Sequence, residues 1–245
     1  MGGTNNSSYG SLNFVLLGVM KMKRSKQMSD SIRLGIVLAM AGGFMDAYSY
    51  LCRGQVFANA QTGNMLLMGV NLAEQNWKIA LYYFCPVLAF TLGIMLADFV
   101  RIKTKDTEGV HWRQWAVLFE AIVLAGVCFI PQSMNLLANS LTSFACAIQV
   151  ESFRKIRGNA IATTMCIGNL RSATQHFCDY IATGEKVSMK KSLLYFEIIL
   201  AFVLGAILGN VILGKLHEMA LMVCAGILGI AFIMMFIDKN QERKV

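Results

Sequence analysis

The sequence predicts an all-α integral membrane protein with six transmembrane helices, arranged as two inverted three-span halves that each contain a re-entrant half-helix. Three observations predict this class. Apolar residues make up 56% of the chain and charged residues only 15%, whereas a soluble domain carries about a quarter charged residues. Lysine and arginine cluster between long apolar windows, and a short polar motif recurs once along the chain.

Six windows are long and apolar enough to cross a bilayer as helices. They are residues 32–52, 77–100, 114–131, 135–153, 191–214 and 217–238. Two shorter apolar segments, 62–75 and 167–183, each follow a polar, glycine-containing stretch. A helix as short as the first spans only roughly 20 Å of a hydrocarbon core about 30 Å thick. We therefore expect both segments to be half-helices of re-entrant hairpins.

The distribution of lysine and arginine favours re-entrant hairpins over two additional crossings. With both hairpins re-entrant and the N-terminus inside, eighteen of the 22 basic residues lie on the cytoplasmic side and three outside. If both short segments cross, the division becomes twelve to nine, which the positive-inside rule disfavours. We expect cytoplasmic tails at 1–30 and 239–245, with membrane repeats over 31–132 and 133–238.

A dipeptide recurs in the second half of the chain. Gly63-Asn64 is repeated as Gly168-Asn169, an offset of 105 residues. With this offset both halves follow one order of elements: span, polar stretch, short helix, span, span. Because each half crosses three times, the second half is expected to be upside down relative to the first, as in many transporters and channels.

The polar stretches before the half-helices are the expected site. Non-helical backbone at membrane depth is tolerated only where protein or water covers it, and half-helix N-termini favour an anionic or carbonyl-bearing ligand. The candidate pathway or substrate-binding residues are Asp46, Asn59, Gln61, Thr62, Gly63, Asn64, Thr164, Gly168, Asn169 and Arg171. A purely structural role also fits these groups, in which they satisfy the hairpin backbone, and Arg171 also fits a headgroup anchor.

Asp46 lies within the first predicted span, beside Gly42-Gly43, which we expect to let the backbone open. A charge in the hydrocarbon costs at least about 2.5–3.5 kcal/mol, so such residues are usually functional or paired. We interpret Asp46 as a coupling or substrate-binding residue. The alternative is a protonated acid that is hydrogen-bonded to a neighbouring hairpin.

Three further acids lie in apolar windows. Glu120 and Glu197 are additional coupling candidates, although snorkelling or a local interhelical hydrogen bond explains them about as well. Glu151 stands at the repeat position of Asp46, but Arg154 follows it by one helical turn. We therefore interpret Glu151 as one member of a helix-end ion pair.

Two stretches carry a resemblance to a known family. GGFMDAYSYL…VFANAQTGNMLLMGVNLA, together with IQVESFRKIRGNAIATTMCIGNLRS, resembles the YoaK-like family of multi-pass bacterial membrane proteins of unknown function. The resemblance covers about residues 30–238. It implies a location in the bacterial cytoplasmic (inner) membrane, and it implies neither a substrate nor a catalytic residue.

These observations predict a secondary transporter or permease for a small polar or anionic solute or ion. A channel of the same architecture and a non-transporting assembly or partner protein are the alternatives. The seven cysteines lack metal-ligand or disulfide spacing and the spans lack protease motifs, so we predict no cofactor, no metal and no enzymatic activity. The basic residues mark span ends, which excludes nucleic acid as an expected partner. The expected partner is the lipid bilayer, and a homodimer is left open.

Overall fold

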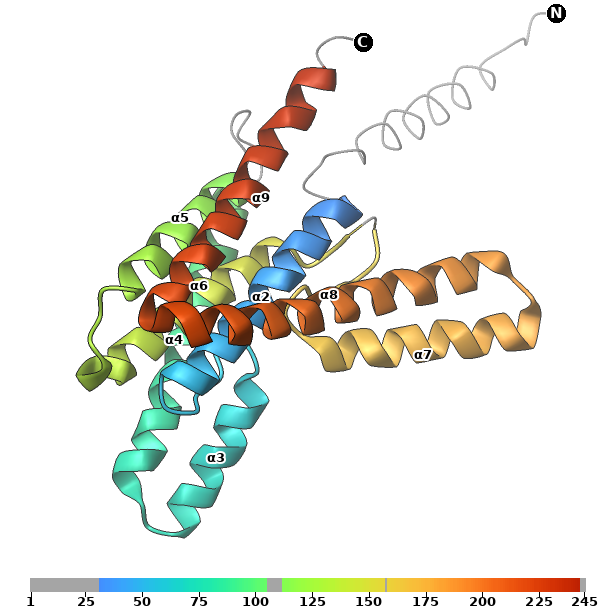
Figure 1. The fold of residues 1–245 in the computed structure, drawn as a ribbon. Helices are drawn as coiled ribbons and strands as arrows, with labels where there is room; N and C mark the ends of the chain where they lie inside the picture. Colours follow the sequence, from blue (N-terminus) through green and yellow to red (C-terminus); the bar gives the residue numbers. More distant parts are fainter. Residues whose placement is uncertain (1–30, 105–111, 157, 243–245) are drawn as a thin grey trace, which may run out of the picture.

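The computed structural model describes residues 31–104, 112–156 and 158–242, which are helices joined by short loops (Figure 1). The helices are α2 (Ile32–Cys52), α3 (Gln61–Ala73), α4 (Trp77–Lys103), α5 (Trp112–Val127), α6 (Asn135–Ser152), α7 (Cys166–Thr183), α8 (Lys186–Leu216) and α9 (Ala220–Glu242), with short 3-10 helices at Gln132–Met134 and His217–Met219. Within these ranges the β-type pairing is limited to one isolated bridge. The prediction of an all-helical protein is confirmed, while the N-terminal tail predicted at 1–30 lies outside the described residues.

Three segments of the described chain are long and apolar enough to cross a membrane. They are Ile32–Cys52, Trp77–Lys103 and Lys186–Phe236, the last of which joins α8 and α9. The other two predicted windows form α5 and α6, which have 16 and 18 residues. Helix α9 continues to Glu242, beyond the predicted start of the C-terminal tail, because nothing in its last turn breaks the helix.

Two polar loops interrupt the helices where the sequence predicts it. The first break loop (residues 53–60) joins α2 to α3, and the second break loop (residues 153–165) joins α6 to α7. The two helices that follow, α3 and α7, have 13 and 18 residues. Their N-termini lie within one residue of the predicted half-helix starts, and no side chain caps either end by a hydrogen bond in the described structure.

The contacts between helices repeat from the first half of the chain to the second. If α2, α3, α4 and α5 are replaced by α6, α7, α8 and α9, and the reverse, the same pairs of helices are in contact. Helix α2 packs along α8, and α6 packs along α4; α3 lies on α4, and α7 lies on α8. Helix α5 contacts α6 as α9 contacts α2, and α5 and α9 pack on each other. In Figure 1 the α3–α4 and α7–α8 hairpins extend from a central group of helices in different directions. The two halves therefore interlock, with the first helix of each half packed on the third helix of the other.

Helices α2 and α8 touch through their backbones because glycine stands at the points of contact. A Cβ at Gly43 would overlap the carbonyl of Phe202, and a Cβ at Gly205 would overlap the carbonyl of Met40. Helix α2 is continuous through this region. The expectation that Gly42-Gly43 lets the backbone open is therefore wrong, and Gly43 instead allows α8 to approach closely.

The main apolar core lies where α2, α5, α6 and α9 meet. Phe44 of α2, Leu124 of α5 and Leu228 of α9 are fully buried in it. Their close contacts stabilise the fold through van der Waals packing. This core holds α2 in place, and α2 in turn positions both break loops.

Candidate functional site

One asparagine in the first turn of α3 and one in the first turn of α7 hold the backbone of the loop before each helix. Through Oδ1, Asn64 accepts the N–H of Phe57 at 3.0 Å, and its Nδ2 donates to the Phe57 carbonyl at 2.8 Å. Asn169 holds Ala162 in the same way, at 3.3 and 2.6 Å. The offset of 105 residues carries each partner of the first clamp onto its counterpart in the second. The recurring dipeptide is therefore the signature of two equivalent asparagine clamps.

The glycines of the two dipeptides have different surroundings. A Cβ at Gly63 would lie 2.7 Å from the ring of Phe57, so the glycine allows that ring to lie against α3. A Cβ at Gly168 would meet nothing within 4 Å. The repeat therefore preserves the position of the glycine, while only the first half uses it for close packing.

Asp46 of α2 holds the first break loop from the other side. One of its carboxylate oxygens accepts the N–H of Asn59 at 2.7 Å, and the backbone N–H groups of Ala58 and Ala60 also face the carboxylate. Cys166, the first residue of α7, lies close enough to interact electrostatically with it. Asp46 therefore lies near the N-terminal ends of both half-helices, where the helix dipoles favour a negative charge.

The two break loops meet at Gly42, one helical turn before Asp46. The side chain of Asn59 donates from Nδ2 to the Gly42 carbonyl at 3.3 Å. Thr164 lies on the same glycine, since a Cβ there would be 2.8 Å from the Thr164 methyl carbon. Asn59 and Thr164 are repeat-equivalent positions, and each keeps a buried oxygen, Oδ1 and Oγ1, without a hydrogen-bond partner in the described structure.

A pocket of about 1020 Å³ lies at this junction. Its wall includes five of the predicted site residues, namely Asp46, Asn59, Gln61, Thr62 and Thr164, and the aromatic residues Tyr50, Phe57, Phe90 and Phe202. Most of the remaining lining is aliphatic and comes from α2, α3, α4 and α8. Among the described residues that line the pocket, Asp46 is the one charged side chain. The pocket thus has a polar end built by both halves and apolar walls.

The other predicted site residues lie outside this lining. Arg171 is exposed on α7, and Asn64 and Asn169 form the clamps. Gln61 belongs to both the first clamp and the pocket wall. It accepts a hydrogen bond from Asn64 at 2.8 Å and donates one to the Ala58 carbonyl at 2.8 Å. Half of the predicted residues therefore line one pocket, and the polar ones among the rest anchor the loops or lie on the surface.

Glu120 of α5 is a second fully buried acid, and it contacts Gln149 of α6. The Gln149 amide links this acid to the second break loop. Its Nε2 donates to the two Glu120 oxygens at 3.2 and 3.0 Å, and its oxygen accepts from Thr163 Oγ1 at 3.2 Å. An amide oriented in this way satisfies both its donor and its acceptor groups.

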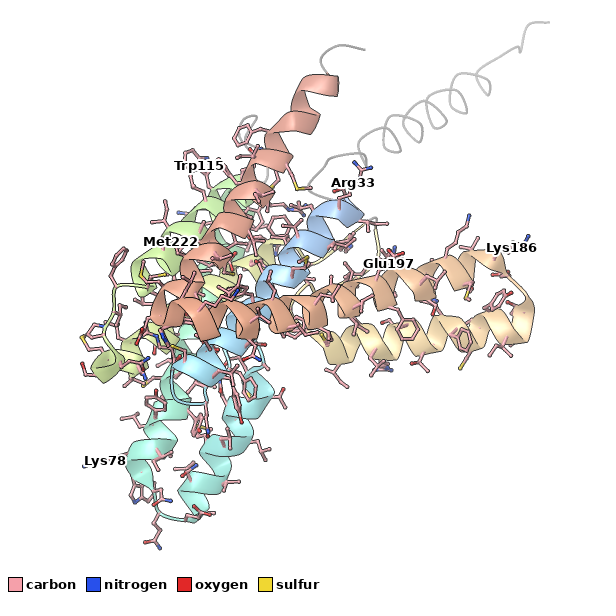
Figure 2. The ribbon with its side chains drawn as sticks, in the orientation of Figure 1. Arg33, Lys78, Trp115, Lys186, Glu197 and Met222 are labelled. Carbon is pink, nitrogen blue, oxygen red and sulfur yellow. The ribbon has the colours of Figure 1, made fainter. Side chains whose placement is uncertain are left out.

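Glu197, the remaining coupling candidate, has a different environment. It lies on the exposed face of α8, along the hairpin that α8 forms with α7 (Figure 2). It is absent from the pocket lining. Glu197 therefore lies outside the pocket. Glu120 is connected to Thr163 of the second break loop through the Gln149 side chain.

Two features of the site were not found from the sequence. Arg53, one of the three basic residues predicted to lie outside, is fully buried and donates to the carbonyls of Val127 and Ile130 at 3.1 and 2.8 Å. It caps the C-terminal end of α5, and nothing in its sequence context distinguishes it from an arginine that faces headgroups. The aromatic wall was also missed, although Tyr50 before the first break loop and Phe57 within it, whose rings stack at 4.8 Å, are visible in the sequence.

The fold and its pocket define a helical transmembrane protein. The chain belongs to the family described as protein of unknown function (DUF1275), whose model matches residues 34–234. It is similar to UPF0700 transmembrane protein YoaK of Bacillus subtilis (strain 168), with 23% identity over 181 residues, which cover 70% of this chain and 79% of that protein. No solved structure is a significant match. The family resemblance drawn from the motifs is therefore confirmed.

Proposed function

We propose that the protein is a secondary transporter, or permease, of the bacterial inner membrane that carries a small solute through the pocket at Asp46. The observation that carries this proposal is the position of the pocket. Both halves supply its polar end, and the N-terminal ends of α3 and α7 converge on it. Interrupted helices that meet at a site are the architecture of several transporter folds.

The proposed architecture has six spans in two inverted halves. The exchange symmetry of the helix contacts supports an internal repeat, and so does the equal spacing within the two asparagine clamps. An odd number of crossings in each half makes the repeat inverted. The bias of basic residues supports cytoplasmic termini.

Proton coupling is assigned to Asp46 and Glu120. The hydrogen bonds of Gln149 support this role, because its amide donates to Glu120 and accepts from Thr163, so a proton on Glu120 changes the acceptor on which this chain of hydrogen bonds ends. Thr163 adjoins Thr164 of the pocket wall. The titratable groups that face Glu120 are the thiols of Cys146 on α6 and Cys224 on α9, and no charged partner faces it from the described residues.

The proposal is tested by labelling single cysteines from each side of the membrane. In a cysteine-free background, T62C and T164C are treated with a membrane-impermeant thiosulfonate in right-side-out and inside-out vesicles. We expect T62C to react from the outside and T164C from the cytoplasm, because the two inverted hairpins are proposed to enter the membrane from opposite faces. Two control positions lie at the tips of the hairpins (Figure 2). K78C, on the α3–α4 hairpin, is the control for the outer face, and K186C, on the α7–α8 hairpin, is the control for the cytoplasmic face.

Each outcome separates the candidate functions. Labelling of both positions from one side alone contradicts the inverted halves. If neither T62C nor T164C is labelled from either side while the two control positions still react, the result contradicts a transport pathway and favours an assembly or partner protein. Simultaneous labelling of each position from both sides favours a channel of the same architecture.

A further inference from the structure

We propose that the pocket binds a primary organic ammonium ion with an apolar, aromatic-sized body. This proposal names the solute class of the transporter proposed above and rests on that function. It replaces the anion expected from the half-helix N-termini, for reasons that lie in the hydrogen bonds of the pocket.

The polar end of the pocket lies around a single turn of α2. Asp46 is at one end of this turn, and Asn59 and Thr164 meet Gly42 at the other. Asn59 and Thr164 are 2% and 3% exposed, yet Oδ1 and Oγ1 have no partner in the described structure. A buried polar atom without a partner costs about 1–3 kcal/mol, so a ligand that satisfies both atoms gains that free energy.

These atoms require a ligand that donates hydrogen bonds. The N–H groups of the first break loop already face Asp46, so that carboxylate occupies the position that an anionic solute would need. Asn59 Oδ1 and the carboxylate are acceptors, and the Thr164 hydroxyl can accept. A primary ammonium has three N–H donors, one for each of the acceptors on Asp46, Asn59 and Thr164.

Charge also favours a cation. No lysine, arginine or histidine is present among the described residues that line the pocket, and Asp46 supplies its charge. Arg171, the cation expected to attract an anion, is exposed on α7 and outside the lining. An anion would thus meet a carboxylate without a compensating side chain.

The walls suit an apolar body attached to that ammonium. Tyr50 and Phe57 stack on each other at the pocket, and Phe90 and Phe202 line it from α4 and α8. Aromatic faces attract a cation by about 0.5–2 kcal/mol and also bury apolar surface. A volume of about 1020 Å³ is ample for a ligand with a single ring.

The test uses Cys166, which is half-buried in the pocket wall, as the reporter. In the full-length protein with Cys166 as its one cysteine, in detergent or nanodiscs, the rate of thiosulfonate labelling is measured with three probes of one shape. These are phenethylammonium, 2-phenylethanol and phenylacetate, which differ in the charge of the head group. We expect saturating phenethylammonium to slow labelling at least about tenfold more than phenylacetate, equivalent to about 1.4 kcal/mol.

A pair of threonine variants separates binding from folding. In the Cys166-only protein, T164A removes a hydroxyl that has no hydrogen bond in the described structure, so it leaves the fold intact and weakens phenethylammonium protection. T91A is the matched control, because Thr91 lines the same pocket but its hydroxyl already donates to the Val87 carbonyl at 2.9 Å. We expect protection in T91A to equal that of the starting protein.

Several results would overturn the assignment. Protection by phenylacetate or 2-phenylethanol equal to or greater than that by phenethylammonium excludes an ammonium site, and so does absence of protection by all three probes. Equal losses in T164A and T91A exclude the proposed contact. The sided labelling of T62C and T164C decides the transport function independently, so an error in the solute class is distinguishable from an error in the function.

Discussion

The two break loops share one backbone anchor and differ in what lies beside it. In both halves an asparagine of the following half-helix holds the loop seven residues before it. In the first half the acid at the repeat position, Asp46, contacts the loop and the pocket. In the second half Glu151 instead pairs with Arg101 and Arg154 at 3.4 and 3.3 Å, which confirms the predicted helix-end pair.

This difference shows how a repeat becomes an asymmetric site. The asparagine clamps are needed in both halves because each loop leaves helical geometry and its backbone must be satisfied. The neighbouring positions carry no such requirement, and they differ between the two halves. One half supplies a carboxylate, the other supplies Thr164, and Gly42 allows both loops to reach the same turn of α2.

The largest expected effect is a difference between Asp46 and Glu151 in the protection of Cys166 from labelling. D46N removes the charge from the pocket, so we expect it to abolish protection of Cys166 by phenethylammonium while labelling of Cys166 itself continues. E151Q, at the equivalent position of the second half, leaves protection unchanged. The measurement is the labelling rate with and without the probe, and equal losses in both variants would contradict the asymmetry.

The next effect concerns the clamps. N64A and N169A each leave a buried loop backbone unsatisfied, which costs about 1–3 kcal/mol in the free energy of unfolding. N64A should be the more destabilising, because Asn64 also donates to Gln61. Thermal unfolding in detergent measures both, with N76A on an exposed side chain as the control. The clamp assignment fails if N76A is as destabilising as N64A.

A smaller effect concerns Glu120. We expect the labelling rate of T164C to change with pH beyond the change that ionisation of the thiol causes, because protonation of Glu120 changes the acceptor of the Gln149 amide, which holds Thr163. All rates are therefore divided by that of K186C at the same pH. E120Q should hold the rate near its low-pH value across the range, and Q149L should remove the dependence by breaking the link. E197Q is the control, on an exposed acid; a flattened profile in that variant would contradict the proposed relay.

The smallest effect is expected at the Glu151 ion pairs. Arg101 and Arg154 are partly exposed, and exposed pairs contribute about 0–1 kcal/mol. E151Q should therefore lower the unfolding midpoint by no more than a few degrees, and less in high salt. A loss as large as that of N64A would show that the second half also depends on its acid.

Much of this fold follows from local sequence. Apolar length predicts the long helices, and the change from polar to apolar sequence predicts where α3 and α7 begin. The polar pocket follows from Asp46 together with the break loops. These features depend on residues that are close in the chain.

The parts that were missed depend on tertiary packing. Gly42-Gly43 looks like a point where a helix opens, and only the approach of α8 shows that Gly43 is a contact. The guanidinium of Arg53 reaches carbonyls more than seventy residues away. The link from Glu120 to Thr163 passes through Gln149 on a third element. No local sequence pattern predicts contacts between residues that are so far apart in the chain.

The central claim is that the two break loops face each other across one pocket. Ala60 and Met165, the residues just before α3 and α7, are repeat-equivalent, exposed and part of the pocket lining. In a cysteine-free background, A60C/M165C should be cross-linked within one molecule by a short bifunctional thiosulfonate. A60C/T183C, with its second cysteine at the far end of α7, should not. Cross-linking of the control pair, or failure of A60C/M165C although each cysteine reacts alone, would contradict the account.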